Sequence, residues 1–149
     1  MNTDFKLPKK NLYIILISCA VIISASAIET MIIVKDIDLY NQWIAQIKDI
    51  NAMDIDSMDL LNTYISLNLI QFLTKIIIPM ALGIYSYFTF YYSKINRLFI
   101  FIWTVLVVGG FAYTFLDFRT ASIFYYISIL GHKVLIYGII SISSKIESN

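Results

Sequence analysis

Long apolar stretches dominate the pattern of hydrophobic and polar positions along the chain. Four of them are long enough to be transmembrane helices, at about 11–34, 64–92, 98–116 and 121–142. A helix needs roughly 20 mostly apolar residues to cross a bilayer core of about 30 Å. The pattern therefore predicts an all-α integral membrane protein, a single domain built from four transmembrane helices.

The segment 35–63, between the first two spans, is more polar than the spans. In its first half, apolar residues recur at helical spacing, at Leu39, Trp43, Ile44, Ile47 and Ile50. This spacing is typical of an amphipathic helix, and aromatic side chains favour the membrane interface. We therefore predict an amphipathic helix in an outer loop, lying at the surface of the bilayer.

Loop lengths and charges predict how the spans are arranged. The connections "SKINR" and "DFRT" are short, so the last three spans should be antiparallel neighbours in a bundle. Most basic residues fall on one side of the predicted membrane, at Lys6, Lys9, Lys10, Lys94, Arg97 and Lys145. The other side holds Lys35, Lys48 and Arg119. The positive-inside rule then places both termini in the cytoplasm, with the protein in the cell membrane.

Composition supports membrane insertion and excludes several classes of function. The chain is 59% hydrophobic and 14% charged, whereas soluble domains carry about 25% charged residues. A net charge of +1 offers no basic patch for a nucleic acid. The single cysteine, Cys19, excludes an intrachain disulfide and a cysteine-rich metal site. No motif predicts a cofactor, and the frequent Ile, Lys, Asn and Tyr are typical of a bacterial, AT-rich genome.

The first span has a second interpretation, as a secretory signal. The basic "LPKK" precedes an apolar run with small residues at Ala25-Ser26-Ala27, as at a cleavage site. Apolar residues resume after Ala27 as "IETMIIV", which makes the stretch longer than the apolar core of a typical signal. We therefore expect the segment to be retained as a transmembrane helix.

Small residues in two of the spans predict close helix packing. Gly131 and Gly138 lie one heptad apart on one side of the last span, and Ala20, Ser24 and Ala27 form a small-residue stripe in the first. Small side chains allow helix backbones to approach each other closely in a bilayer. We interpret both stripes as packing surfaces.

Two ionisable residues fall in the outer halves of the first two spans. Glu29 lies about 9 Å past the midpoint of the first span, and Lys75 lies at a similar depth in the second. Because charges inside a bilayer usually pair with one another, we predict an intramembrane ion pair between Glu29 and Lys75. The alternative is that Lys75 extends alone to the outer headgroups while Glu29 lies at the boundary.

The last span carries two adjacent ionisable residues, His132 and Lys133, near its midpoint. Lys133 shares a helical stripe with Tyr126 and Tyr137, and His132 lies on the neighbouring stripe. We expect this polar and aromatic flank to face the bundle interior. These four residues are the candidate binding site.

Three interpretations of that flank stay open. In the first, the lysine and histidine line a water-accessible cavity that binds an anion or passes a proton. In the second, tyrosine hydroxyls and backbone carbonyls satisfy both groups at a helix or subunit contact. In the third, the span is shifted and Lys133 reaches the cytoplasmic headgroups. We favour the packing contact.

No catalytic motif or cluster of metal ligands is present in the sequence. We therefore expect a non-enzymatic protein that acts through helix–helix interactions. It would be an accessory subunit of a membrane complex or an immunity-type protein that protects against a membrane-active toxin. Its partners would be the lipid bilayer and either another protein or further copies of itself. The alternatives are a small oligomeric transporter or channel using Lys133 and His132, and, with least support, a membrane enzyme.

Overall fold

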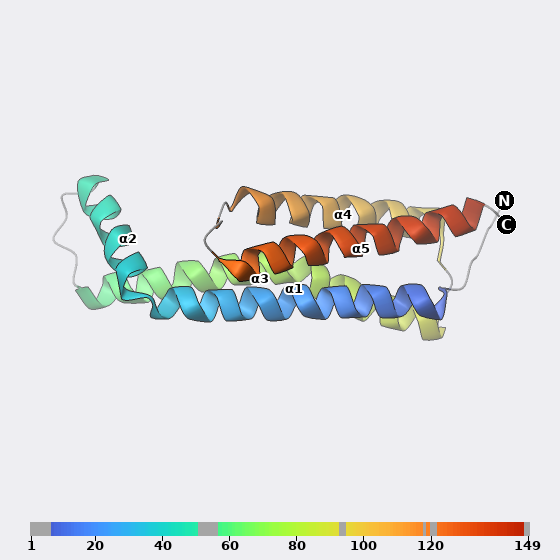
Figure 1. Cartoon of the computed structure of the whole chain (residues 1–149), viewed down its shortest axis with the longest axis horizontal. Coiled ribbons are helices and arrows are strands. Elements are labelled where there is room, and N and C mark those ends of the chain that lie inside the picture. The colour runs from blue at the N-terminus through green and yellow to red at the C-terminus, as the bar shows by residue number, and fades with distance from the viewer. Residues whose placement is uncertain (1–6, 51–56, 93–94, 118, 120–121, 148–149) are drawn as a thin grey trace.

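The computed structural model describes residues 7–50, 57–92, 95–117, 119 and 122–147. These residues fold into five helices and contain no strand. The helices, shown in Figure 1, are α1 (Lys9–Lys35), α2 (Ile37–Ile50), α3 (Ser57–Tyr92), α4 (Arg97–Leu116) and α5 (Ile123–Glu147). The predicted all-helical fold is confirmed for this part of the chain.

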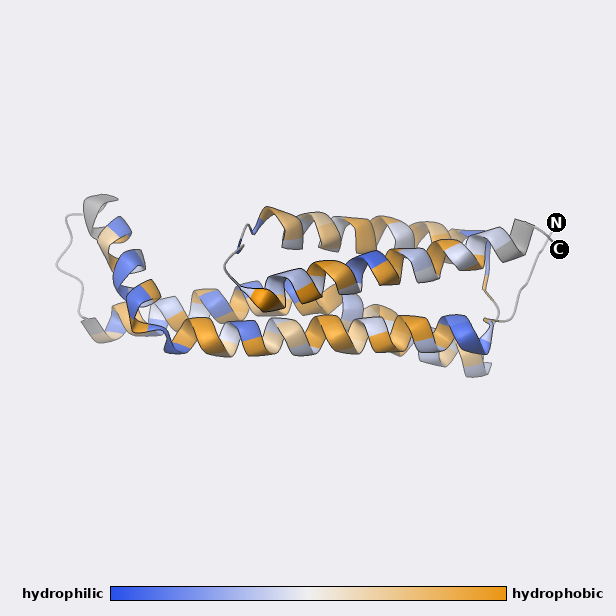
Figure 2. Ribbon diagram, viewed as in Figure 1, coloured by the Kyte–Doolittle hydropathy of each residue, from blue (hydrophilic) through white to orange (hydrophobic). Residues whose placement is uncertain are grey.

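Four of the helices have the length and composition of membrane spans. α1, α3, α4 and α5 are each long and apolar enough to cross a bilayer, and Figure 2 shows hydrophobic residues along most of their length. They correspond to the four predicted spans, although residue 121, the predicted start of the last one, lies outside the described residues. The chain thus has the make-up of a multi-pass membrane protein.

The four long helices lie side by side along one axis (Figure 1). α1 packs against both α3 and α5, and α4 packs mainly against α5. The buried residues of α4 are Ile100, Val107 and Thr114. Because these lie one heptad apart, they form a single narrow stripe on the helix. Most of the α4 surface therefore lies outside the bundle.

α1 and α5 approach each other closely at the two glycines of α5. A methyl group added at Gly131 would lie 2.7 Å from Cγ1 of Ile22, and one at Gly138 would lie 3.0 Å from Cγ2 of Ile14. The side-chain amide of Asn11 also donates a hydrogen bond to the carbonyl oxygen of Gly138, at 3.1 Å. The predicted packing role of these glycines is confirmed, because a side chain at Gly131 would clash with Ile22 and one at Gly138 would press tightly against Ile14.

α2 and the first half of α3 extend the fold beyond the bundle. α3 has 36 residues, or about 54 Å of helix, and it continues past the ends of α4 and α5 (Figure 1). The helix predicted within 35–63 is present as α2, and α3 begins at Ser57, ahead of the predicted apolar span at about 64–92. The early start has a simple reason: no glycine or proline lies between Ser57 and Pro79.

An aromatic cluster joins α2 to α3. The ring of Tyr64 on α3 packs against both Tyr40 and Trp43 of α2, with ring centroids 5.3 Å apart in each pair. The hydroxyl of Tyr64 donates a hydrogen bond to the carbonyl oxygen of Ile33, near the end of α1, at 3.1 Å. A single tyrosine therefore fixes the positions of α1, α2 and α3 relative to one another.

The close contact between α1 and α5 generates a stability prediction. We expect Gly131→Ala to lower the free energy of unfolding by about 1–3 kcal/mol relative to Gly109→Ala, because the new methyl group overpacks against Ile22. Gly109 is the matched control, since it is also helical but has no atom within 4 Å of an added methyl group. Reversible unfolding in mixed detergent micelles measures the difference. Equal stability of the two variants would contradict the packing role.

Candidate functional site

A network of charged side chains lies where α1, α3 and the α4–α5 connection meet. The ammonium of Lys75 lies 2.6 Å from a carboxylate oxygen of Asp117 and 3.2 Å from Oε2 of Glu29. The same oxygen of Asp117 lies 2.9 Å from Nε of Arg119, and Arg119 Nη2 donates to the amide oxygen of Gln71 at 2.7 Å. The network therefore links all three regions, and its positive and negative charges balance.

The structure brings Glu29 and Lys75 together and adds Asp117 as a second carboxylate partner. Sequence reasoning missed Asp117, although its place at the end of a predicted span was a usable signal. α4 contains 20 residues, about 30 Å of helix and so close to the thickness of a bilayer core. Asp117 caps this helix, so the network lies at one end of the apolar layer. It is farther from the centre of the layer than the sequence suggested.

Glu29 is buried, but only one of its two carboxylate oxygens has a partner among the described residues. Its Oε2 bonds to Lys75, whereas Oε1 has no hydrogen-bond partner among the described residues. A buried carboxylate oxygen without a donor is unfavourable, because it loses its hydration and gains nothing in return. This atom therefore marks a place where a donor from another molecule would be stabilising.

The structure separates His132 from the other residues of the predicted flank. His132 is 1% exposed, and its Nδ1 donates a hydrogen bond to the carbonyl oxygen of Ser128 at 2.9 Å, since a carbonyl can only accept. Its Nε2 has no partner among the described residues and faces Gly110 of α4. The ring also packs against Phe111, with centroids 6.2 Å apart. His132 is thus an interior packing residue between α5 and α4.

The other three residues of the predicted flank are exposed: Tyr126, Lys133 and Tyr137. Lys133 is exposed, and Tyr126 and Tyr137 are 54% and 68% exposed. The expectation that this stripe faces the bundle interior is wrong. Successive residues on a helix are about 100° apart, so burial of His132 turns its neighbour Lys133 outward. The four residues do not form one site.

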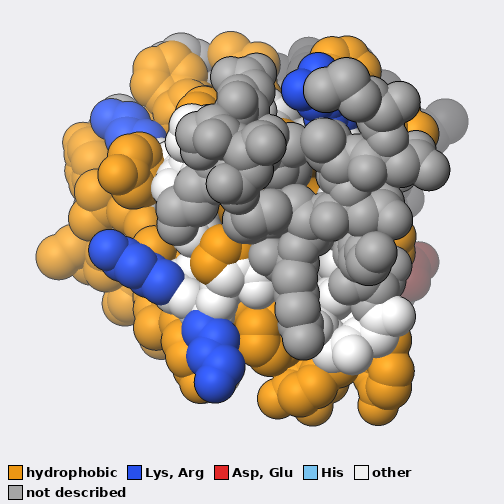
Figure 3. Space-filling view, turned by 90° about the vertical axis from the view of Figure 1, so that its right-hand side faces the viewer, with side chains coloured by type: hydrophobic (Ala, Val, Ile, Leu, Met, Phe, Trp, Pro, Cys, Tyr) orange, Lys and Arg blue, Asp and Glu red, His pale blue; other side chains and the backbone are white. Residues whose placement is uncertain are grey.

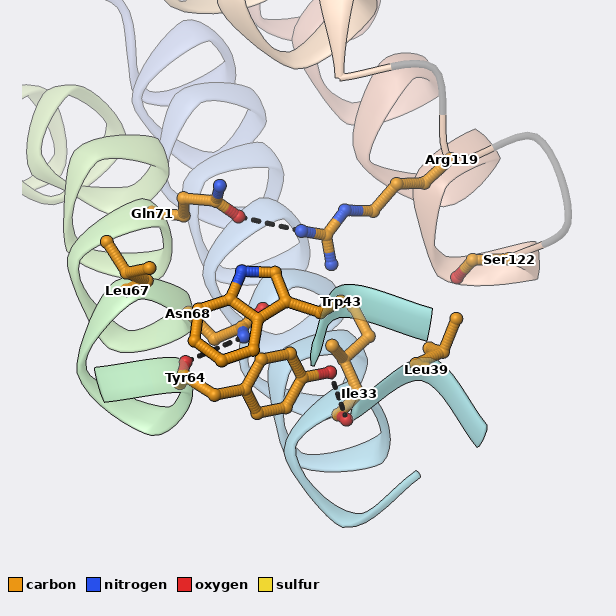
Figure 4. A pocket seen from close by; sticks show the side chains of 9 residues that line it. All are labelled: Ile33, Leu39, Trp43, Tyr64, Leu67, Asn68, Gln71, Arg119 and Ser122. Atoms are coloured by element: carbon orange, nitrogen blue, oxygen red, sulfur yellow. Dashed lines mark hydrogen bonds between the residues drawn. The ribbon is translucent and has the colours of Figure 1, made fainter. Parts of the chain in front are cut away.

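A cavity of about 420 Å³ lies beside the charged network (Figure 4). Its walls come from α1, α2, α3 and the α4–α5 connection, with the side chains of Ile33, Leu39, Trp43, Tyr64, Leu67, Asn68, Gln71, Arg119 and Ser122. Figure 4 shows Arg119 reaching across toward Gln71, with the tilted rings of Trp43 and Tyr64 below them. The cavity therefore combines an apolar and aromatic wall with amide and guanidinium donors.

Sequence reasoning did not identify this cavity. Its polar residues, Gln71 and Arg119, are far apart in the sequence, and its aromatic residues belong to two different helices. Each residue alone has an ordinary interpretation at the end of a span. Within the described residues, no group of three or more His, Cys, Asp and Glu side chains could hold a metal ion.

Comparison with protein-family models, curated proteins and solved structures finds no match to this chain.

The charged network generates a second stability prediction. We expect Lys75→Met to lower the free energy of unfolding by about 3–5 kcal/mol, because it leaves Glu29 and Asp117 without their shared cation. Adding Glu29→Gln should recover part of the loss by removing one unpaired carboxylate. Lys35→Met, the same change at an exposed lysine of α1, serves as the control. If Lys75→Met and Lys35→Met have the same free energy of unfolding in mixed micelles, the charged network does not stabilise the fold.

Proposed function

We propose that this chain is a non-enzymatic interaction protein of the cell membrane that binds the transmembrane helix of another protein on the outward face of α5. Such a protein would be an accessory subunit of a membrane complex or an immunity-type protein that protects against a membrane-active toxin. One observation carries the proposal: Lys133 lies exposed at the middle of a membrane-spanning helix.

The position of Lys133 makes contact with lipid alone unfavourable. The apolar part of α5 runs from Ile123 to Ser144, so Lys133 lies about 15 Å of helix from either end. A lysine at the centre of a span costs about 2.5–3.5 kcal/mol on insertion scales. No described residue forms an ion pair with it. A partner that supplies a negative charge at this depth would remove the cost.

The surroundings of Lys133 indicate the chemistry of that partner. Tyr126 and Tyr137 lie on the same exposed stripe and offer hydroxyl groups on either side of the ammonium. An Asp or Glu carboxylate on a neighbouring transmembrane helix would pair with Lys133 and accept hydrogen bonds from the tyrosine hydroxyls. The acidic side chains that the structure describes are Glu29 and Asp117 of the charged network, Asp36 and Asp38 at the beginning of α2, and Asp59 at the beginning of α3. A different protein is therefore favoured over a second copy.

For the orientation, we propose an antiparallel four-helix bundle with both termini in the cytoplasm. Figure 3 views the end of the molecule opposite α2, and Lys and Arg side chains lie across it. The described basic residues here are Lys9, Lys10 and Arg97. The α2 end carries the acidic residues Asp36, Asp38 and Asp59 beside Lys35 and Arg119. This distribution follows the positive-inside rule, which supports a cytoplasmic location of the basic end.

The proposed interaction predicts a cross-link that depends on Lys133. A photo-cross-linking amino acid at Leu130, which is exposed one turn from Lys133, should capture a heterologous membrane protein in native membranes. Lys133→Met should abolish this product and Lys133→Arg should retain it, because the arginine keeps the charge. Mass spectrometry of the product should find an Asp or Glu in a transmembrane helix of the partner.

The same probe at Ile102, exposed on α4, is the matched control and should not give this product. Lys133→Met should also unfold at the same temperature as the natural chain, because Lys133 contacts no described charge. Cross-links to lipid alone would contradict the proposal. A product of two identical chains would instead favour the alternative, an oligomeric transporter or channel in which several copies of Lys133 line one pathway.

The orientation has a direct chemical test. The single natural cysteine, Cys19, is buried, so cysteines can be added singly after Cys19→Ser. We expect a membrane-impermeant maleimide to label Asn41→Cys on α2 in intact cells and to leave Arg97→Cys unlabelled until the membrane is permeabilised. Both positions are exposed on the protein. The reverse pattern would place the termini outside.

A further inference from the structure

Three adjoining hollows form a continuous path down one side of the molecule. The cavity beside Arg119 shares Ile33, Leu39 and Ser122 with a second cavity of about 320 Å³. The second cavity shares Phe124 with a groove of about 380 Å³ between α1 and α5. The path therefore begins at the end of the apolar layer and continues into it.

The first hollow offers hydrogen-bond donors to an anion. The guanidinium of Arg119 uses one N–H toward Asp117 and another toward Gln71, and Figure 4 shows its second terminal nitrogen directed toward the cavity. Guanidinium groups bind phosphate well because their planar N–H donors match its oxygens. Trp43 and Tyr64 form the opposite wall, as amphipathic rings do at headgroup depth.

The second hollow offers an acceptor. Glu29 lines it, and this is the buried carboxylate whose Oε1 has no hydrogen-bond partner among the described residues. The remaining wall is apolar, formed by Ile32, Ile33, Ile123 and Phe124 among others. A molecule that occupied this hollow would satisfy Glu29 only by presenting an N–H or O–H group.

The third hollow is an apolar groove of the length of one leaflet. It extends along α1 from Ile17 to Ile28, about 16 Å of helix, or half of a bilayer core of about 30 Å. Ala20 and Ser24 form its floor and are exposed. These small residues, predicted to form a packing surface, do not pack against a described helix of this chain. They leave a groove beside α5 instead.

We propose that this path binds one phospholipid of the leaflet on the α2 side. Its phosphate lies against Arg119, a donor group of its head hydrogen-bonds to Glu29, and one acyl chain lies in the groove over Ala20 and Ser24. The three hollows offer, in order, hydrogen-bond donors, an acceptor and an apolar groove. These features match the phosphate, the donor group of the head and the acyl chain of such a lipid. The site is separate from Lys133, which does not line any of the three.

The headgroup requirement gives the first test. The purified chain would be placed in phosphatidylcholine nanodiscs that contain added phosphatidylethanolamine, added phosphatidylglycerol or neither. Native mass spectrometry would then count the lipids that stay bound after the protein is released from the nanodisc. We expect preferential retention of one phosphatidylethanolamine or phosphatidylglycerol, whose heads carry N–H or O–H donors, over phosphatidylcholine, whose head carries none. Equal retention of all three would overturn the proposal.

Two variants test the two ends of the path. Ala20→Phe fills the groove without touching the charged network and should reduce retention of the lipid, whereas Ala112→Phe, the same change at an exposed alanine of α4, should not. Arg119→Gln should weaken binding roughly tenfold, the loss expected for one charge-assisted hydrogen bond. Lys133→Met should leave retention unchanged. Full retention by Ala20→Phe, or equal losses in Ala20→Phe and Ala112→Phe, would show that no lipid occupies the groove.

Discussion

The ammonium of Lys75, held between the carboxylates of Glu29 and Asp117, is the interaction on which the arrangement of the helices depends. It joins α1 to α3 and both to the end of α4. Glu29 and Lys75 are buried, and buried charges are tolerated in an apolar layer when they are paired. The pairing therefore sets the relative height of three helices, and it fixes where the apolar layer ends and where α2 and the first half of α3 begin to extend beyond it.

Once these heights are set, the two long sides of α5 acquire different roles. Gly131 and Gly138 bring α5 against α1, and this contact turns His132 into the interior and Lys133 outward. The interior side is a packing surface on which His132 is enclosed by protein. The outer side combines a charge, two tyrosines and an apolar surface, which is the chemistry of a contact with another transmembrane helix. This division supports the proposed interaction with another transmembrane helix.

The end of the molecule near α2 has a different character from the middle of the bundle. Residues from α1, α2, α3 and the α4–α5 connection meet there around a cavity, and their polar atoms are only partly satisfied by one another. The same region contains the aromatic cluster that joins α2 to α3. A molecule bound here would complete hydrogen bonds and also stabilise the position of α2.

The sequence by itself determined the helical class, the four apolar spans, the amphipathic helix after the first span, and the matching depth of Glu29 and Lys75. These are local properties, because length, hydropathy and spacing act within one helix. The tertiary structure alone decided that Asp117 joins the ion pair, that Ala20 and Ser24 border a groove, and that Lys133 faces away from the bundle. Each depends on how a helix is rotated about its axis. That rotation is set by contacts between residues distant in sequence, such as Gly131 with Ile22, which no periodicity within a single span specifies.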